Sequence, residues 1–200
     1  AIISRTGYTG EPGGFELYVH PDKAATLWLF LLEEGKTLGI RPAGLGARDS
    51  TRMEAGLPLY GHELAGPHDL LPCEIGYGGF VKTYKPFFVG RSAYLKRMAA
   101  SRREMIRFRA VEQGARPFHP GDPVVSPKGI CIGFVTSATV VDGRPLGLAT
   151  VQKGHAEIGG RVGLFPLPRA EKGGNGPAKA PRDLKAGDRL PLHLEAEVMT

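Results

Sequence analysis

Beyond about residue 100 the sequence breaks into short strand-like runs that glycine and proline separate from one another. The runs are Met105–Val111, Pro123–Ser126, Ile130–Ser137, Leu146–Gln152, Gly160–Leu164 and Leu190–Val198. In the last of them leucine, alanine and valine occupy every second position, which is the period of a half-buried strand. Several short strands in succession predict a small sheet or barrel. We therefore expect a β-barrel domain at residues 101–200, with a Pro/Gly-rich surface loop or disordered insert at about 166–189.

The first hundred residues have a different texture, in which a strand precedes helices. Residues 14–20 place Phe15, Leu17 and Val19 on one face and Glu16, Tyr18 and His20 on the other. This alternation predicts a half-buried strand. A helix should follow, because Pro21-Asp22 is a favourable start and the apolar residues at 27, 28, 31 and 32 have helical spacing. Gly35 should cap its end, and Trp28 is expected to anchor it in a core.

A second helix is expected from Pro42 to about Ala55, where Gly56 ends it. Leu45 and Met53 should face the core of this region. The segment at 57–88 is dense in glycine and proline and should form turns and short strands, and residues 91–100 should form a short helix. The predicted fold class is therefore α+β, with residues 1–100 as the first domain.

Composition narrows the range of functions. An apolar fraction of 42% with 23% charged residues is ordinary for a globular protein, and the longest apolar run, 27–32, is too short to cross a bilayer. The two cysteines, Cys73 and Cys131, have no partner at Cys-x-x-Cys spacing and are expected to be small core residues in a reducing, cytoplasmic setting. The histidines are scattered, so no metal site is expected. The chain lacks an initiator methionine and opens in strand-like sequence, which suggests a fragment.

Two side chains are candidates for ligand binding. Glu16 follows a glycine-rich turn at 7–14 that would let the backbone approach a flat ligand closely, although a solvent-facing glutamate is the commoner case. Arg48 lies in the middle of the second helix and would offer a planar donor fork to a carboxylate, or would pair with Asp49 or Glu54. The glycines at 44 and 46 lack the third glycine of a dinucleotide fingerprint, and we discount that motif.

Six basic residues gather at the expected domain junction. They are Lys96, Arg97, Arg102, Arg103, Arg107 and Arg109. Together with the net charge of +6 they could serve an anionic partner such as a nucleic acid, or form a solvated basic surface. No aromatic residues interleave with these charges as a base-stacking platform requires, so we favour the solvated surface and do not expect nucleic-acid binding.

Four segments resemble signature blocks of a known family. They are Arg-Thr-Gly-Tyr-Thr-Gly-Glu at 5–11, Gly-Leu-Gly-Ala-Arg-Asp-Ser at 44–50, Lys82-x-x-Lys85-Pro-Phe-Phe-Val-Gly-Arg91, and Ile-Gly-Phe-Val-Thr-Ser at 132–137. These blocks are similar to those of the aminomethyltransferase family, the folate-dependent T-protein of the glycine cleavage system. The similarity runs in register from residue 3 to about 165.

The resemblance implies a fold and an activity. Residues 1–100 would be the later part of the family's folate-binding region, an antiparallel sheet with helices, followed by the small C-terminal β-barrel. Such an enzyme moves an aminomethyl group from the lipoyl arm of the H-protein to tetrahydrofolate. The resemblance places folate contacts on Tyr8, Glu16 and Arg48. It also leaves open a related folate-dependent demethylase and a non-catalytic folate-binding module that assists RNA modification.

Three departures from the family pattern accompany this resemblance. The family's catalytic aspartate lies upstream of the Gly-Tyr-Thr-Gly motif, so no catalytic residue is assigned here. The turn before Glu16 carries one extra residue, because Glu11-Pro12-Gly13-Gly14-Phe15 stands where the family has Glu-Asp-Gly-Phe. The ligand-contacting tyrosine of the family's C-terminal ending is not recognisable in this sequence.

Overall fold

A computed structural model describes residues 1–65, 68–167, 184–190 and 194–199. The chain divides into two units, Ala1–Leu57 and Pro58–Thr200. The segment 58–100 thus falls in the same unit as the residues of the barrel. The domain boundary at residue 100 that the sequence suggests stays a prediction.

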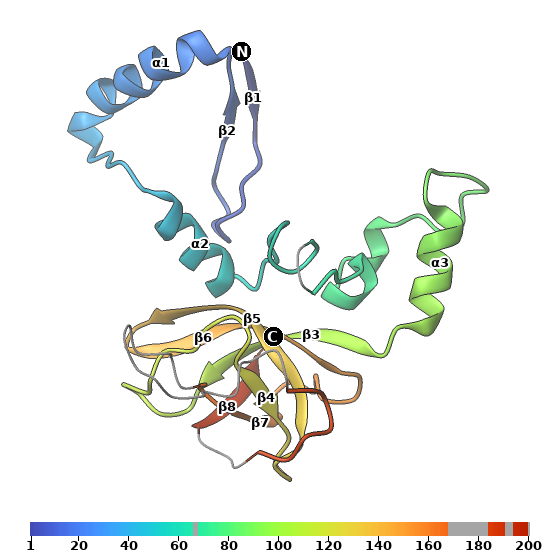
Figure 1. Ribbon diagram of the computed structural model, residues 1–200. Helices are drawn as coiled ribbons and strands as arrows, with labels where there is room; N and C mark the ends of the chain where they lie inside the picture. Colours follow the sequence, from blue (N-terminus) through green and yellow to red (C-terminus); the bar gives the residue numbers. More distant parts are fainter. Residues whose placement is uncertain (66–67, 168–183, 191–193, 200) are drawn as a thin grey trace, which may run out of the picture. The chain divides into compact units, whose positions relative to one another are not determined.

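The first unit is a β-hairpin with two helices (Figure 1). Strand β1 (Ile2–Ser4) pairs antiparallel with β2 (Glu16–Tyr18), so that Ile3 lies opposite Leu17. Helix α1 (Pro21–Glu34), the short 3-10 helix η1 (Lys36–Leu38) and helix α2 (Leu45–Glu54) follow.

Local sequence sets the ends of α1 as expected. Pro21 occupies the first helical turn, where a missing N–H costs nothing, and the His20 side chain accepts a hydrogen bond from the Asp22 N–H at 3.4 Å. At the other end Gly35 is the C-terminal cap and donates its N–H to Leu31 O at 3.0 Å. The predictions of this helix and of its glycine cap are confirmed.

Burial in this unit differs from the sequence prediction. Phe15 and all three residues of β2 are exposed, so the strand exists but is not half-buried. The reason is that β2 has β1 as its neighbour and a two-stranded ribbon leaves both faces open. No residue of α1 is buried, and Trp28 is half exposed, so the prediction of a core anchor there was wrong.

Helix α2 is shorter than predicted. It begins at Leu45 because Gly44, its N-cap, has extended backbone angles (φ −89°, ψ 177°), so the prediction of a start at Pro42 was wrong. Met53 is buried as expected, whereas Leu45, in the first turn, is exposed and does not face a core.

The second unit starts with turns and short helices and ends in a barrel. The segment 57–88 holds turns and the 3-10 helices η2 (Pro72–Ile75) and η3 (Gly78–Phe80), and no strand is present in its described residues 57–65 and 68–88. The short strands expected there were therefore wrong, because frequent glycines and prolines break extended pairing. Helix α3 (Arg91–Ala100) forms where the sequence predicts it.

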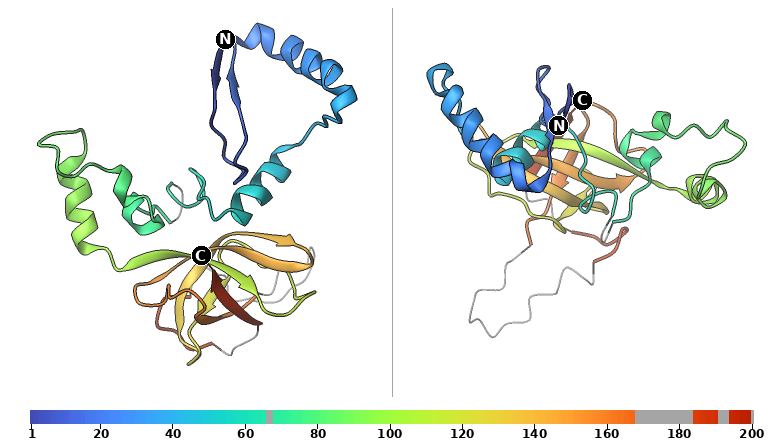
Figure 2. Two further views of the ribbon diagram at one scale, coloured as in Figure 1. Left: turned by 180° about the vertical axis from the view of Figure 1, so that it is seen from behind. Right: turned by 90° about the horizontal axis from the view of Figure 1, so that it is seen from above.

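Six strands close into an antiparallel barrel in the order β3-β6-β5-β4-β7-β8 (Figures 1 and 2). They are β3 (Arg103–Ala110), β4 (Pro123–Val125), β5 (Cys131–Val141), β6 (Arg144–Gln152), β7 (Arg161–Leu164) and β8 (Leu194–Met199). Pairing of β3 with β8, such as Phe108 with Val198, closes the ring. The fold-class prediction, an antiparallel sheet with helices followed by a small barrel, is confirmed.

Apolar side chains fill the barrel. Phe108 and Phe118 meet edge to face, with ring centroids 5.8 Å apart, among aliphatic residues from every strand. At Gly133 strands β5 and β6 approach so closely that a Cβ would lie 1.8 Å from Thr150 O. Cys131 is buried as expected, whereas Cys73 is only half-buried, and both are free thiols. Residues 168–183 of the expected insert lie outside the described residues.

Candidate functional site

The glycine-rich loop between β1 and β2 reaches the C-terminal end of α2 (Figure 1). Gly10 has a positive φ of 85°, and a Cβ built on it would lie 2.4 Å from the Cβ of Ala55. Only glycine meets both conditions without strain. The backbone of the loop therefore lies directly against the Ala55 side chain at the end of the helix.

This contact brings Tyr8 and Arg48 together. The Arg48 guanidinium lies over the Tyr8 ring, with Cζ 5.9 Å from the ring centroid. A cation at this distance from an aromatic face is attracted by it. Asp49, which the sequence offered as a partner for Arg48, binds Arg52 instead, with Nη2 2.7 Å from Oδ1. Arg48 is thus exposed beside the Tyr8 ring.

Glu16 lies on the strand that leaves the loop. Its Oε2 accepts hydrogen bonds from the Thr6 hydroxyl and from the Tyr18 hydroxyl, the latter at 3.3 Å. The negative charge of the Glu16 carboxylate raises the pKa of Tyr18, and both side chains are exposed. Among the described residues no hydrogen bond or ion pair joins Glu16 to Arg48. The structure brings Tyr8 and Arg48 into contact and leaves Glu16 on the neighbouring strand.

A shallow hollow of about 220 Å³ lies where the loop meets α2. Its lining consists of Thr9, Gly10, Glu11, Thr51, Glu54 and Ala55. Two carboxylates and two hydroxyls offer mainly hydrogen-bond acceptors here, and Arg48 lies one turn before Thr51 on the same helix. The hollow therefore offers acceptors to the N–H groups of a polar ligand, while Tyr8, Glu16 and Arg48 are not among its described lining residues.

A buried carboxylate in the second unit escaped the sequence analysis. Glu63 is completely buried; it accepts hydrogen bonds from the Leu59 N–H at 2.7 Å and from the Ser137 hydroxyl at 2.6 Å. Ser137 lies at a β-bulge in β5, and its Oγ is also 3.3 Å from Nδ1 of His62. Gly61, with a φ of 96°, immediately precedes His62 and Glu63. This glycine was the sequence feature that could have drawn attention to them. The cluster ties the segment after Pro58 to the barrel wall.

Comparisons with known proteins fit this architecture. Residues 1–85 match the family model described as the GCVT N-terminal domain. Aminomethyltransferases from Caldanaerobacter subterraneus subsp. tengcongensis and Moorella thermoacetica are 43% and 46% identical to the chain; each match covers 80% of the chain and 42% and 43% of the relative. Over this region the chain is similar to the aminomethyltransferase family. Its resemblance to this family, given above on four sequence blocks, is thereby confirmed.

A solved structure shows the same relationship for the fold. The glycine cleavage system aminomethyltransferase T from Bartonella henselae matches 99% of the chain with a TM-score of 0.73 and 25% identity, over 48% of its own length. The chain thus spans less than half the length of each of these aminomethyltransferases. Within the described residues, no helix has the length and apolar character needed to span a membrane.

Proposed function

We propose that the chain takes part in the tetrahydrofolate-dependent transfer of an aminomethyl group, as in the T-protein of the glycine cleavage system. The proposal is supported by relatives that bear the name aminomethyltransferase and share more than 40% of aligned residues. The contact between Tyr8 and Arg48, residues 40 positions apart in the sequence, is the structural observation that carries it. The two side chains in this contact are two of the three that we propose to bind folate.

Tetrahydrofolate suits the chemistry of the loop and α2. The pterin edge presents parallel N–H donors, which a carboxylate such as that of Glu16 accepts in pairs. Arg48 would stabilise negative charge on the ligand, and the Tyr8 ring offers an apolar surface to a flat heterocycle. The close approach of Gly10 to Ala55 would fix the loop before the ligand arrives, which lowers the entropy cost of binding.

The proposal also names the donor of the aminomethyl group and the cellular compartment. The aminomethyl group would come from the lipoyl arm of the H-protein, and the transferase would work in the cytoplasm. In this proposal Tyr8, Glu16 and Arg48 bind and orient folate, and none of them is assigned as the catalytic acid.

Folate titration tests the binding site. We expect Glu16→Gln and Arg48→Ala each to weaken tetrahydrofolate binding about tenfold or more, because each removes a charged partner of the ligand. Two matched controls lie on exposed positions of the same unit, Glu34→Gln for the acid and Arg41→Ala for the base. The measurement is calorimetric titration of each variant with tetrahydrofolate under anaerobic conditions. Affinity that is the same in the Glu16 and Arg48 variants as in their controls would refute the assignment.

A further inference from the structure

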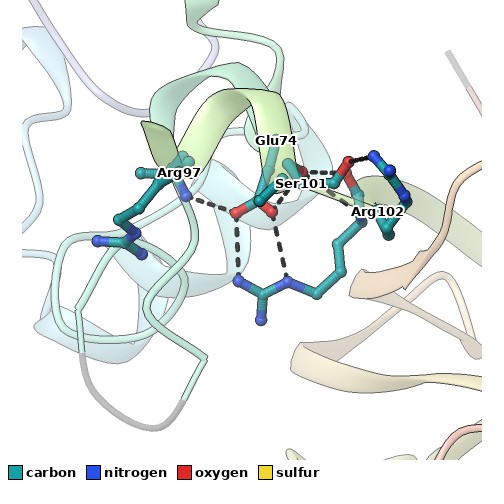
Figure 3. A pocket seen from close by; sticks show the side chains of 7 residues that line it. Glu74, Arg97, Ser101 and Arg102 are labelled. Carbon is teal, nitrogen blue, oxygen red and sulfur yellow. Dashed lines mark hydrogen bonds and ion pairs between the residues drawn. The ribbon is translucent and has the colours of Figure 1, made fainter. Parts of the chain in front are cut away.

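A hollow in the second unit, distinct from the loop and α2, collects three arginines of the basic cluster noted in the sequence. It has a volume of about 350 Å³ and lies where η2, the end of α3 and the start of β3 meet (Figure 3). The lining residues on which the argument depends are Leu71, Glu74, Arg97, Ser101, Arg102 and Arg103. From the sequence we expected this cluster to form a solvated basic surface. In the structure three of its six residues, Arg97, Arg102 and Arg103, line one cavity.

The cavity has more positive than negative charge. Arg97 pairs with Asp69, with Nη2 2.9 Å from Oδ2, and Arg103 pairs with Glu74 at 3.3 Å. Arg102 donates a hydrogen bond from Nη1 to Ser101 O at 3.1 Å, and within the described part of the chain no carboxylate forms an ion pair with it. Asp69 and Glu74 therefore balance the charges of Arg97 and Arg103. The positive charge of Arg102 can interact with a ligand.

The floor of the cavity is rigid. The Glu74 carboxylate is buried and accepts hydrogen bonds from the Leu71 N–H and the Ser101 hydroxyl, both at 2.7 Å. Arg103 is held between Glu74 and the carbonyl oxygen of His68, 3.0 Å from its Nη1. Figure 3 shows Arg97 and Arg102 on opposite sides of the Glu74 carboxylate. Arg103 is thus fixed by Glu74 and the His68 carbonyl, and Arg102 lies beside this fixed group with its charge exposed to a ligand.

We propose that this cavity binds a small anion that carries two or more carboxylate or phosphate groups. Guanidinium groups are donors only, and each has five N–H bonds, of which Arg102 uses one in its contact with Ser101. Their planar fork matches the oxygens of carboxylate and phosphate. The volume suits a small molecule, and among the described residues that line the cavity there is no aromatic side chain on which a nucleic-acid base would stack. The site is independent of the proposed folate contacts.

Calorimetric titration with pyrophosphate and with citrate, at low ionic strength, tests the proposal. We expect the complete chain to bind at least one of them, and Arg102→Ala to weaken that binding about tenfold. The matched control is Arg109→Ala, which removes an exposed arginine of the same strand region outside the cavity and lowers the net charge equally. Which of the two probes binds more tightly identifies the head group that the site prefers.

Three results would overturn the proposal. They are failure of both probes to bind, an equal loss in the Arg102 and Arg109 variants, and binding of a single-stranded RNA oligonucleotide that both variants weaken alike. Circular dichroism melting checks that each variant is folded. If Arg102→Ala does not fold, Arg102→Gln replaces it, because a glutamine keeps two of the three methylene groups of the arginine stem while it removes the charge.

Discussion

In the barrel, Phe108, Val135 and Leu164 are completely shielded from solvent, whereas in residues 1–57 Trp28, Leu29 and Phe30 expose 50%, 65% and 57% of their surface. Both units are rich in apolar residues, but a sheet closed on itself covers its own interior and a hairpin with two helices does not. Composition alone therefore does not determine burial. The barrel is thus stabilised by its own core, while the proposed folate contacts depend on a few local interactions such as those of Gly10 and Arg48.

The largest expected difference comes from removing one phenylalanine in each unit. Phe108→Ala should lower the free energy of unfolding by about 3–5 kcal/mol, because it leaves a cavity in a packed core. Phe30→Ala should cost less than about 1 kcal/mol, because more than half of that ring is already exposed. Urea denaturation of the full chain, followed by circular dichroism, measures both. Similar losses in the two variants would show that α1 is covered as fully as the barrel.

Replacing one glycine by alanine in each unit should give effects of opposite sign. Gly133→Ala should destabilise the barrel by about 3 kcal/mol, because its Cβ would overlap with the backbone of Thr150. Gly46→Ala, in the first turn of α2 with no atom within 4 Å of the new Cβ, should stabilise the chain by up to about 1 kcal/mol. Thermal unfolding of the two variants and of the parent chain measures the sign and size of both stability changes. A destabilising Gly46→Ala would mean that this face of α2 is in contact with another group.

The smallest expected effect is a pH dependence confined to the second unit. Burial alone would raise the pKa of Glu74, but hydrogen bonds from Ser101 and the Leu71 N–H and the charge of Arg103 outweigh it, so the pKa lies below the ordinary 4.5. A lowered pKa stabilises the fold fully above pH 4.5, and this stabilisation is lost as the pH falls through the folded-state value.

Denaturation between pH 6 and pH 3 measures this contribution. Glu74→Gln should show a smaller loss of stability over the acidic part of that range than the parent chain, because its side chain does not titrate. The exposed Glu112→Gln is the control and should follow the parent. If Glu74→Gln also loses as much stability as the parent on acidification, the carboxylate of Glu74 is not the group responsible.

Periodicity and turn residues predicted most of the secondary structure. The barrel was predicted from short strand-like runs separated by glycine and proline, and α1 from its helical spacing, because these signals are local. Burial in the first unit was not predictable in the same way. The apolar spacing at Leu27 and Trp28 is that of a core-facing helix, yet burial depends on a partner surface that no local pattern specifies.

The candidate site shows the same limit. Family resemblance pointed to Tyr8 and Arg48, and the structure shows these two side chains in contact. The sequence alone did not show that Asp49 pairs with Arg52 and not with Arg48, its neighbour in the sequence. Glu63 and Ser137 lie 74 positions apart in sequence, and no sequence motif links them. The cavity around Arg102 combines residues from three elements, so that its shape follows from tertiary packing alone.

The link between β7 and β8 is attached to the barrel at both of its ends. Leu167 donates its N–H to Asp122, and Gly187 and Leu190 donate their N–H groups to the carbonyl oxygens of Cys131 and Gly129. These contacts lie outside residues 168–183, and the pairing of β7 with β8 involves residues 161–164 and 194–197. A change in the length of the connection that keeps these contacts therefore leaves the strand register unaltered.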